Sequence, residues 1–286
     1  MTSPDHPCRI CGGPTSHAFV ANQISIVDCS VCGHRQADIA VDASHVEATY
    51  ADDYFTGGGA GYEDYSSEGP MLVARGKRYG QILADKTTPG RVVDIGAAAG
   101  FLAEGMQSGG WSAIGIEPNE TMAAAARARG LDVRTGTAES LLSGFDRGSF
   151  DAVTMIQVIA HLGDPLGSIK TASELLRPGG LLLIETWDRS SISARVFGKK
   201  WHEYSPPSVV HWFTRRELDD VARRAGFTRV ATGRYPKKIT AAHGRQLVEH
   251  RMGTNHLVTK AARLIPGRLT VPYPGDDLFW SLYRNR

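Results

Sequence analysis

The sequence of 286 residues contains no long apolar run and no excess of charge of either sign. No stretch approaches the roughly 20 apolar residues that a membrane-spanning helix needs, and the first residues lack the apolar core of a secretory signal. Lysine and arginine number 32 and aspartate and glutamate 30, for a formal net charge of +2. This balance argues against a nucleic acid or a membrane surface as the main partner. A hydrophobic content of 42% and a charged content of 22% are those of an ordinary globular protein.

Cysteine is scarce, and its placement is informative. The four cysteines form two CxxC pairs, Cys8 with Cys11 and Cys29 with Cys32, separated by 17 residues. Two such pairs predict a tetrahedral zinc site with four thiolate ligands, which is closed and structural. The alternative is reduced structural thiols or a redox pair, although a redox motif needs only one CxxC. We therefore expect a zinc ribbon over residues 1–40, and its thiolates favour the reducing cytoplasm.

Residues 41–88 are expected to form an aromatic lid and a leading helix. The stretch 50–65, YADDYFTGGGAGYEDY, places five aromatic side chains around a centre with too many glycines for a helix or a core strand. A plain linker has little use for five rings, so we favour a lid over a ligand. Met71–Lys86 follows with the apolar spacing of an amphipathic helix. The candidate ligand-facing residues of the lid are Tyr54, Tyr62 and Tyr65.

Short apolar strands and helices alternate through residues 89–286. This alternation specifies an α/β fold with a doubly wound, mostly parallel sheet of seven strands. The loop 188–213 is expected to bind an acceptor, and 236–268 form a basic cap. The ribbon strands are predicted at His17–Val20 and Gln23–Val27, and those of the core at Arg91–Ile95, Ser112–Ile116, Leu131–Arg134, Asp151–Val158, Gly180–Thr186, Phe227–Ala231 and Asp277–Tyr283. The core helices are predicted at Phe101–Gln107, Thr121–Arg129, Leu166–Leu176 and Thr214–Ala225.

The turn after the first core strand predicts an adenosine-containing ligand. The small-residue turn GAAAG lets the backbone approach a ligand closely, and Glu117, 23 residues after Asp94, can accept hydrogen bonds from ribose hydroxyls. An acid directly before the turn would repel a pyrophosphate, which disfavours a nicotinamide cofactor. Asp94 suits a ligand with an amine and a sulfonium, such as S-adenosylmethionine.

These segments resemble the motifs of a known enzyme family. VVDIGAAAGFLAEGM resembles motif I of the class I S-adenosylmethionine-dependent methyltransferases, and AIGIEPNETMAAAARARGLDV, FDAVTMIQVIAHLGDPL and ELLRPGGLLLIET resemble the segments that follow it. The whole chain is similar to a branch with an N-terminal CxxC…CxxC zinc-binding module. The resemblance implies a Rossmann-like methyltransferase sheet, with S-adenosylmethionine and structural Zn²⁺ as cofactors. The cofactor-binding residues that it implies are Asp94, Gly96, Gly100, Glu117, Pro118, Thr137, Ala138 and Gln157.

One departure from related enzymes bears on the mechanism. Related quinone and RNA-end methyltransferases carry Glu-x-x-Glu-His after the fourth core strand, where this chain has Gln157, Ala160 and His161. One imidazole without carboxylates is a poor Mg²⁺ site, so we expect metal-independent transfer. His161 is the first candidate for a general base and His211 the second. A loop-capping role is the alternative for His161.

The stretch Trp201–Phe213 follows the fifth core strand, where this fold builds acceptor loops. Aromatic and histidine side chains suit a sugar or a phenol ring, and the candidate contacts are Trp201, His202 and Tyr204. The alternative is that Trp201, Trp212 and Phe213 are core and pack the loop on the sheet. The basic cap would suit a phosphate-bearing acceptor, although a charged run is more often a solvated surface.

The expected function is methyl transfer, most simply to oxygen, on a small-molecule acceptor such as a sugar, glycan or secondary metabolite. One alternative is methylation of a ribosomal-RNA base with the zinc module recognising RNA, which the balanced charge disfavours. Another is a non-catalytic binding protein on the same fold. No membrane partner is expected, and the oligomeric state stays open.

Overall fold

The structure is a computed structural model that describes residues 6–57, 64–138, 144–234, 238–242, 245, 249, 257–262, 264–272 and 276–286. The chain forms two compact units, Met1–Gly233 together with Asp277–Arg286, and Arg234–Asp276. Among the described residues, no helix has both the length and the apolar character that crossing a membrane requires.

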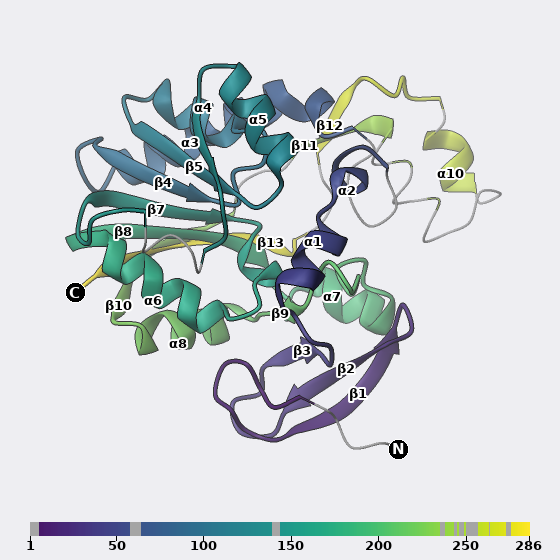
Figure 1. The fold of residues 1–286 in the computed structure, drawn as a ribbon. Helices are drawn as coiled ribbons and strands as arrows, with labels where there is room; N and C mark the ends of the chain where they lie inside the picture. Colours follow the sequence, from purple (N-terminus) through teal and green to yellow (C-terminus); the bar gives the residue numbers. More distant parts are fainter. Residues whose placement is uncertain are drawn as a thin grey trace. The chain divides into compact units, whose positions relative to one another are not determined.

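A seven-stranded sheet forms the centre of the larger unit (Figure 1). Its strands are β4 (Arg91–Ile95), β5 (Ser112–Glu117), β6 (Asp132–Thr135), β7 (Phe150–Ile156), β8 (Leu176–Trp187), β10 (Phe227–Gly233) and β13 (Leu278–Asn285). Their order is β10-β13-β8-β7-β4-β5-β6. The strands from β6 to β8 pair in parallel, whereas β13 is antiparallel to both β8 and β10. This order confirms the predicted doubly wound, mostly parallel sheet.

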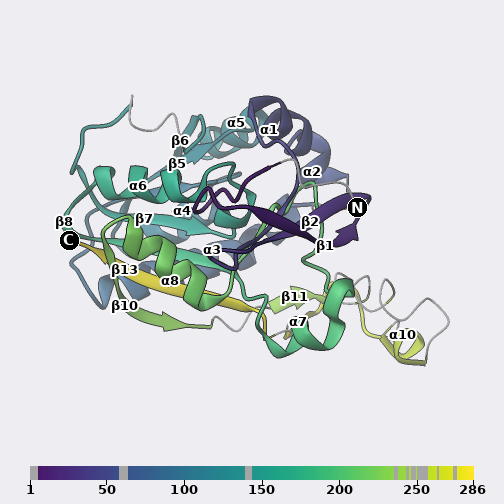
Figure 2. The same ribbon diagram turned by 90° about the horizontal axis from the view of Figure 1, so that it is seen from below.

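Helices cover both faces of this sheet, as Figures 1 and 2 show. The first face carries α3 (Gly69–Ala84), α4 (Phe101–Gln107) and α5 (Glu120–Ala128), and the second α6 (Pro165–Leu175) and α8 (Arg215–Arg224). The alternation of side chains along β4 explains why both faces are covered. Val92 packs in the core with the side chains of α3 and α4, whereas Val93 and Ile95 pack in the core that includes α6 and α8. A strand that is apolar on both faces needs helices on both.

The cysteine-rich N-terminus folds as a small antiparallel sheet. Its strands are β1 (Thr15–Ala21), β2 (Ile24–Cys29), β3 (Arg35–Ala37) and β9 (His211–Trp212). The first two lie where the sequence predicted the ribbon strands. The fourth comes from the predicted acceptor loop and pairs with β3 through Arg35–Trp212 and Gln36–His211. The N-terminal sheet therefore includes a strand from a distant part of the chain.

The segment between the ribbon and the core corrects one prediction. Helices α1 (Ala43–Thr49) and α2 (Asp52–Thr56) precede the 3-10 turn η1 (Ser66–Glu68). We expected no helix within 50–65, but the glycines begin only at Gly57, so the residues before it are free to be helical. Asp52 and Asp53 in the first turn of α2 interact favourably with the helix dipole. Tyr62 of the predicted lid lies outside the described residues.

Shorter elements complete both units. In the larger unit they are η3 (Ile159–His161), α7 (Ile192–Phe197) and η4 (Gly198–Lys200). In the smaller unit, β11 (Lys238–Thr240) pairs antiparallel with β12 (Thr270–Pro272), and α10 (Leu257–Ala262) lies between them in the sequence. Much of the predicted cap, 236–268, lies outside the described residues.

Candidate active site

A cavity opens in the larger unit where β4, β5 and β7 end. Its empty volume is about 1080 Å³, open solvent included. Doubly wound sheets bind their ligands at this edge, outside the carboxyl ends of the parallel strands. The residues singled out from the sequence that line it are Tyr54, Tyr65, Gly96, Glu117, Pro118, Thr137, Ala138, Gln157 and His161.

Two glycines of the turn after β4 have different tasks. Gly96 lines the cavity with a φ of +74°, and a Cβ there would lie 2.4 Å from Cγ2 of Val158. Both the positive φ and the close approach of Val158 therefore require glycine at this position. Gly100 also has a positive φ, +77°, but its Cβ would meet Leu131 Cδ1 at 2.7 Å. Gly100 is absent from the described lining, and the lack of a side chain there permits close packing of the turn against Leu131.

Glu117 is fixed by the backbone at the end of β5. Its side chain is buried, Oε2 accepts a hydrogen bond from Ala98 N at 2.8 Å, and Oε1 accepts one from Asn119 N at 2.9 Å. Burial raises the pKa of this carboxyl, and the two N–H donors oppose that shift. Each carboxylate oxygen can accept a second hydrogen bond. Glu117 is thus oriented and still able to hold two hydroxyl groups.

Asp94 is held beneath the turn, within β4. Its Oδ1 accepts a hydrogen bond from Thr154 Oγ1 at 2.6 Å, and its Oδ2 is buried without a hydrogen-bond partner among the described residues. Burial raises the pKa of this carboxyl to about 7, and the charge of Glu117 adds to the shift. Asp94 is not among the described residues that line the cavity. An unpartnered buried carboxylate oxygen nevertheless favours a cation nearby.

His161 lies in η3 and lines the same cavity. Its Nδ1 is 2.6 Å from the carbonyl oxygen of Ser208 and 3.0 Å from the hydroxyl of Tyr50. That hydroxyl also donates to the Ser208 oxygen, at 2.7 Å. A carbonyl oxygen only accepts, so Nδ1 carries the proton and Nε2 carries the lone pair. Burial lowers the pKa of His161, which keeps the imidazole neutral and able to accept a proton.

A row of aromatic rings forms another wall of the cavity. Tyr50 and Tyr54 meet edge to face with centroids 5.2 Å apart, as do Tyr54 and Phe55, and the centroids of Phe55 and Tyr65 are 5.7 Å apart. Asn119 Nδ2 donates to Tyr50 O and to Asp52 Oδ1, both at 3.0 Å. The predicted lid residues Tyr54 and Tyr65 therefore belong to a packed wall.

A buried ion pair supports the floor of the cavity. Arg75 of α3 and the hydroxyl of Tyr79 both bind the Glu185 carboxylate, and Gln157 Nε2 donates to Glu185 Oε1 at 3.0 Å. Arg75 also lines the cavity, and the sequence analysis missed it. The available signal was an arginine four residues before Tyr79 on the buried side of a helix, where a charge needs a partner.

The three predicted acceptor contacts of the loop and the second candidate base are also absent from the described residues that line the cavity. Trp201 Nε1 donates to Asp277 Oδ2 at 2.7 Å, and the Tyr204 hydroxyl accepts from Arg35 Nη1 at 2.7 Å. His202 pairs with Glu203 at 2.7 Å. The loop buries Trp201 and Tyr204 against the ribbon, with Phe19 and Ile26 in the same cluster, so these two rings form core.

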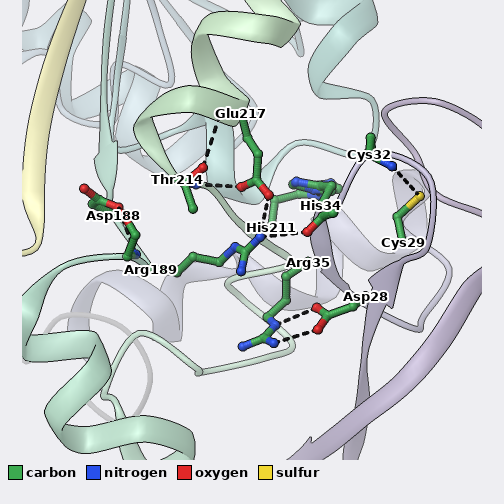
Figure 3. A network of polar contacts seen from close by, with 12 residues as sticks. Asp28, Cys29, Cys32, His34, Arg35, Asp188, Arg189, His211, Thr214 and Glu217 are labelled. Carbon is green, nitrogen blue, oxygen red and sulfur yellow. Dashed lines mark hydrogen bonds and ion pairs between the residues drawn. The ribbon is translucent and has the colours of Figure 1, made fainter.

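The fourth is His211, the second candidate base. It is buried in β9, and its Nδ1 lies 2.9 Å from Nε2 of His34 (Figure 3). Burial lowers the pKa of both imidazoles. His211 therefore contacts the ribbon and does not reach the cavity, because β9 is used to extend the N-terminal sheet.

The four cysteines converge, with all sulfur atoms within 4.8 Å of one another. The Cys8–Cys32 and Cys11–Cys29 sulfur distances are 3.5 and 3.4 Å. A tetrahedral zinc ion with bonds of 2.3 Å would separate its sulfur ligands by about 3.8 Å. The positive φ of Gly12, +71°, lets the chain turn after the first pair. The donor set and its spacing fit a zinc ion.

Known proteins with similar sequences can be compared with this chain. The family described as "Methyltransferase domain" matches residues 73–232. A protein of Cereibacter sphaeroides named ubiquinone biosynthesis O-methyltransferase is 33% identical over 148 residues, which are 48% of this chain and 59% of that protein. A protein of the same name from Xanthomonas campestris is 30% identical over 171 residues, 52% of this chain and 71% of that one. The similarity thus spans less than two thirds of the Cereibacter relative.

Solved structures share the fold. A protein of Thermotoga maritima, described as an S-adenosylmethionine-dependent methyltransferase and possible histamine N-methyltransferase, has a TM-score of 0.51 at 26% identity, covering 77% of this chain and 93% of that one. A putative methyltransferase of Bacillus halodurans has a TM-score of 0.54 at 15% identity, covering 73% of this chain and 97% of that one. The latter likeness concerns the fold alone.

Proposed function

Because the chain belongs to the methyltransferase-domain family, we propose that it transfers a methyl group from S-adenosylmethionine to a hydroxyl oxygen of a small polar acceptor. The observation that carries this proposal is one cavity. Its lining includes both the buried carboxylate of Glu117 beside a glycine turn and the neutral imidazole of His161.

The wall around β4 and β5 suits the cofactor. Glu117 holds the ribose hydroxyls, while Gly96 lets the backbone approach the methionine part. Pro118, Thr137 and Ala138 flank the adenine. Asp94, beneath the turn, favours the positive charge of the ligand without touching it. When bound, S-adenosylmethionine supplies a methyl carbon that is activated by its attachment to a sulfonium.

The part of the lining around His161 suits the acceptor. His161 Nε2 takes the hydroxyl proton as the acceptor oxygen bonds to the methyl carbon and the sulfur–carbon bond breaks. The enzyme's other contribution is alignment of the two reactants. The run from Gln157 to His161 offers one imidazole and no carboxylate, so we propose transfer without a catalytic metal ion.

The rings of Tyr50, Tyr54, Phe55 and Tyr65 favour an acceptor that is itself a ring. Aromatic walls bind the apolar faces of sugars and phenols while polar groups orient their hydroxyls. The relatives named ubiquinone biosynthesis O-methyltransferase support oxygen as the accepting atom. A sugar or a phenol is therefore the proposed acceptor class.

The four clustered cysteines are proposed to hold a structural Zn²⁺ ion. Four thiolates leave no coordination position for a substrate, so this ion takes no part in methyl transfer. A site of this type also favours a reducing compartment, and we propose a cytoplasmic location.

Calorimetric titration tests the cofactor assignment. We expect the protein to bind S-adenosylmethionine but not NAD⁺, and Glu117→Ala to weaken binding about 100-fold because two hydrogen bonds to a charged group are lost. The matched control is Glu120→Ala, which removes an exposed carboxylate three residues away. Unchanged affinity in Glu117→Ala, or binding of NAD⁺ in place of S-adenosylmethionine, would overturn the assignment.

A further inference from the structure

We propose that the zinc ribbon positions the catalytic base, because it holds the carbonyl group that decides which nitrogen of His161 carries the lone pair. The catalytic role of His161 rests on the proposed function. The structural coupling between the ribbon and His161 does not depend on it. In this proposal the ribbon fixes the position of His161 and does not affect cofactor binding.

The Ser208 carbonyl oxygen fixes the tautomer of His161. It accepts from His161 Nδ1 at 2.6 Å and from the Tyr50 hydroxyl at 2.7 Å. Ser208 is itself buried, and its Oγ donates to Ser205 O at 3.1 Å. A shift of this carbonyl would remove the acceptor that keeps the proton on Nδ1. Nε2, the nitrogen proposed to take the hydroxyl proton, would then lose its lone pair to the other tautomer.

The ribbon holds the chain on both sides of Ser208. Two residues before it, Pro206 O accepts from Asn22 Nδ2 at 2.9 Å, and Asn22 lies in the β1–β2 turn. Two residues after it, Val210 O accepts from Ala37 N of β3 at 2.9 Å. Val210 N in turn donates to Ala160 O at 2.9 Å, directly beside His161. The loop is thus bonded to the ribbon on one side and to η3 on the other.

Hydrogen bonds connect β3 to both cysteine pairs. Gln36 of β3 is fully buried, accepts from Arg9 N at 2.9 Å and donates to Pro7 O at 3.0 Å, on either side of Cys8. On the second pair, Cys29 N donates to His34 O at 2.8 Å, just before β3 begins. Both ligand pairs therefore fix the strand that carries the loop.

Further contacts join the second cysteine pair to the core. Gly33 O accepts from Arg189 Nη2 at 2.7 Å, and Arg189 also pairs with Glu217 of α8 (Figure 3). His34 meets His211 of β9 at 2.9 Å. By contrast, the hydrogen bonds of Glu117 go to Ala98 and Asn119 of the core. Loss of the metal should consequently disturb His161 and spare the cofactor.

Nitrogen-15 NMR of the histidine rings reads the tautomer directly, with His161→Gln to assign the signal. In the full-length protein loaded with Zn²⁺ we expect the Nδ1–H tautomer at His161. After chelation of the metal we expect most of this population to shift to Nε2–H, with S-adenosylmethionine affinity changed less than about threefold, and re-added Zn²⁺ to restore it. An unchanged tautomer, or a parallel collapse of cofactor affinity, would overturn the proposal.

A variant that keeps all four cysteines distinguishes the loss of one ribbon contact from unfolding of the ribbon after metal removal. Asn22 and Gln23 both have positive φ, 46° and 65°, so glycine fits either position. Asn22→Gly loses the bond to Pro206 O, and Gln23→Gly is the matched control. We expect backbone hydrogen exchange around Ser208 to rise at least threefold in Asn22→Gly at unchanged zinc content, and to stay unchanged in Gln23→Gly. Equal exchange in both would contradict the proposal.

Methyl-transfer assays separate this inference from the proposed function. With catechol and methyl glucoside as probe acceptors, Asn22→Gly should lower kcat about three- to tenfold without changing cofactor affinity. A wild-type protein that transfers no methyl group to either probe, yet shows the metal-dependent tautomer shift, would count against the proposed reaction and for the ribbon's coupling to His161. A variant with normal kcat and an altered tautomer would count against the coupling as a catalytic device.

Discussion

The two halves of the cavity are built in different ways. The cofactor half is local: Gly96 and Glu117 end neighbouring parallel strands, and the Glu117 side chain bonds to residues 19 and 2 positions away. The acceptor half joins distant segments, since His161 contacts Tyr50 across 111 positions and Ser208 across 47. Sheet topology positions Gly96 and Glu117, whereas the position of His161 depends on long-range contacts. Substitutions should therefore be able to disable one half and leave the other intact.

The largest expected effect is on turnover in the acceptor half. His161→Gln should lower kcat by about 10²- to 10⁴-fold, the range for loss of a general base. Cofactor affinity should change less than about threefold, because His161 and Glu117 form their hydrogen bonds with different residues. Steady-state methyl transfer and calorimetry on the same preparations measure both. His17→Gln, on the surface of the ribbon, is the control, and equal turnover in the two variants would show that His161 is not the base.

The next effect is on the pH dependence of stability in the cofactor half. The pKa of Asp94 is about 7 in the folded protein, above the unfolded value of about 3.9. The folded state therefore binds more protons between these values, and this contribution to stability is lost as the pH rises towards 7. Asp94→Asn removes the titration and keeps the Thr154 bond. From about pH 5.5 to about pH 8, its free energy of unfolding should gain on the order of 2 kcal/mol relative to wild type.

Urea unfolding at both pH values measures this difference. Asp132→Asn serves as the control, since it removes an exposed carboxylate from the same sheet. The same Asp94→Asn variant should bind S-adenosylmethionine more weakly, because the charge that favours the sulfonium and amine is gone. A variant whose stability follows wild type in parallel at both pH values would show that Asp94 is ionised throughout.

The smallest expected effect is on kcat when the Tyr50 hydroxyl is removed. Tyr50→Phe removes the hydroxyl that donates to Ser208 O but keeps the ring in the aromatic wall. The His161–Ser208 bond remains, so we expect kcat to fall only about two- to fivefold, near the value of one neutral hydrogen bond. Single-turnover rates compared with those of Tyr54→Phe would measure it. A loss as large as that of His161→Gln would mean that the tyrosine, not the imidazole, handles the proton.

Much of the fold could be predicted from the sequence. The strand Arg91–Ile95 and the helix Phe101–Gln107 have the predicted bounds, because a short apolar run and a glycine-flanked turn are local signals. The same holds for Glu117, which is the last residue of its strand. The prediction that 50–65 contains no helix is wrong, because it averaged a glycine-rich centre with the helical residues before it.

The acceptor half could be predicted only in part. His161 lines the cavity, but Trp201, Tyr204 and His211 are core between the loop and the ribbon. Aromatic and histidine side chains have the same pattern in a binding loop and in a packed one, so the sequence does not distinguish the two. Arg75 was missed because its partner, Glu185, lies 110 positions away.

The strands of the central sheet, the four cysteine ligands and the acid at the end of β5 could be read from short stretches of sequence, because periodicity, CxxC spacing and strand ends are local properties. Only the tertiary structure decided that β9 joins the ribbon, that His211 is buried there, and that Ser208 O meets His161 Nδ1. These outcomes depend on which distant segments pack together. Hydrogen bonds across such distances are selected by the global fold and have no signature in any short stretch of residues.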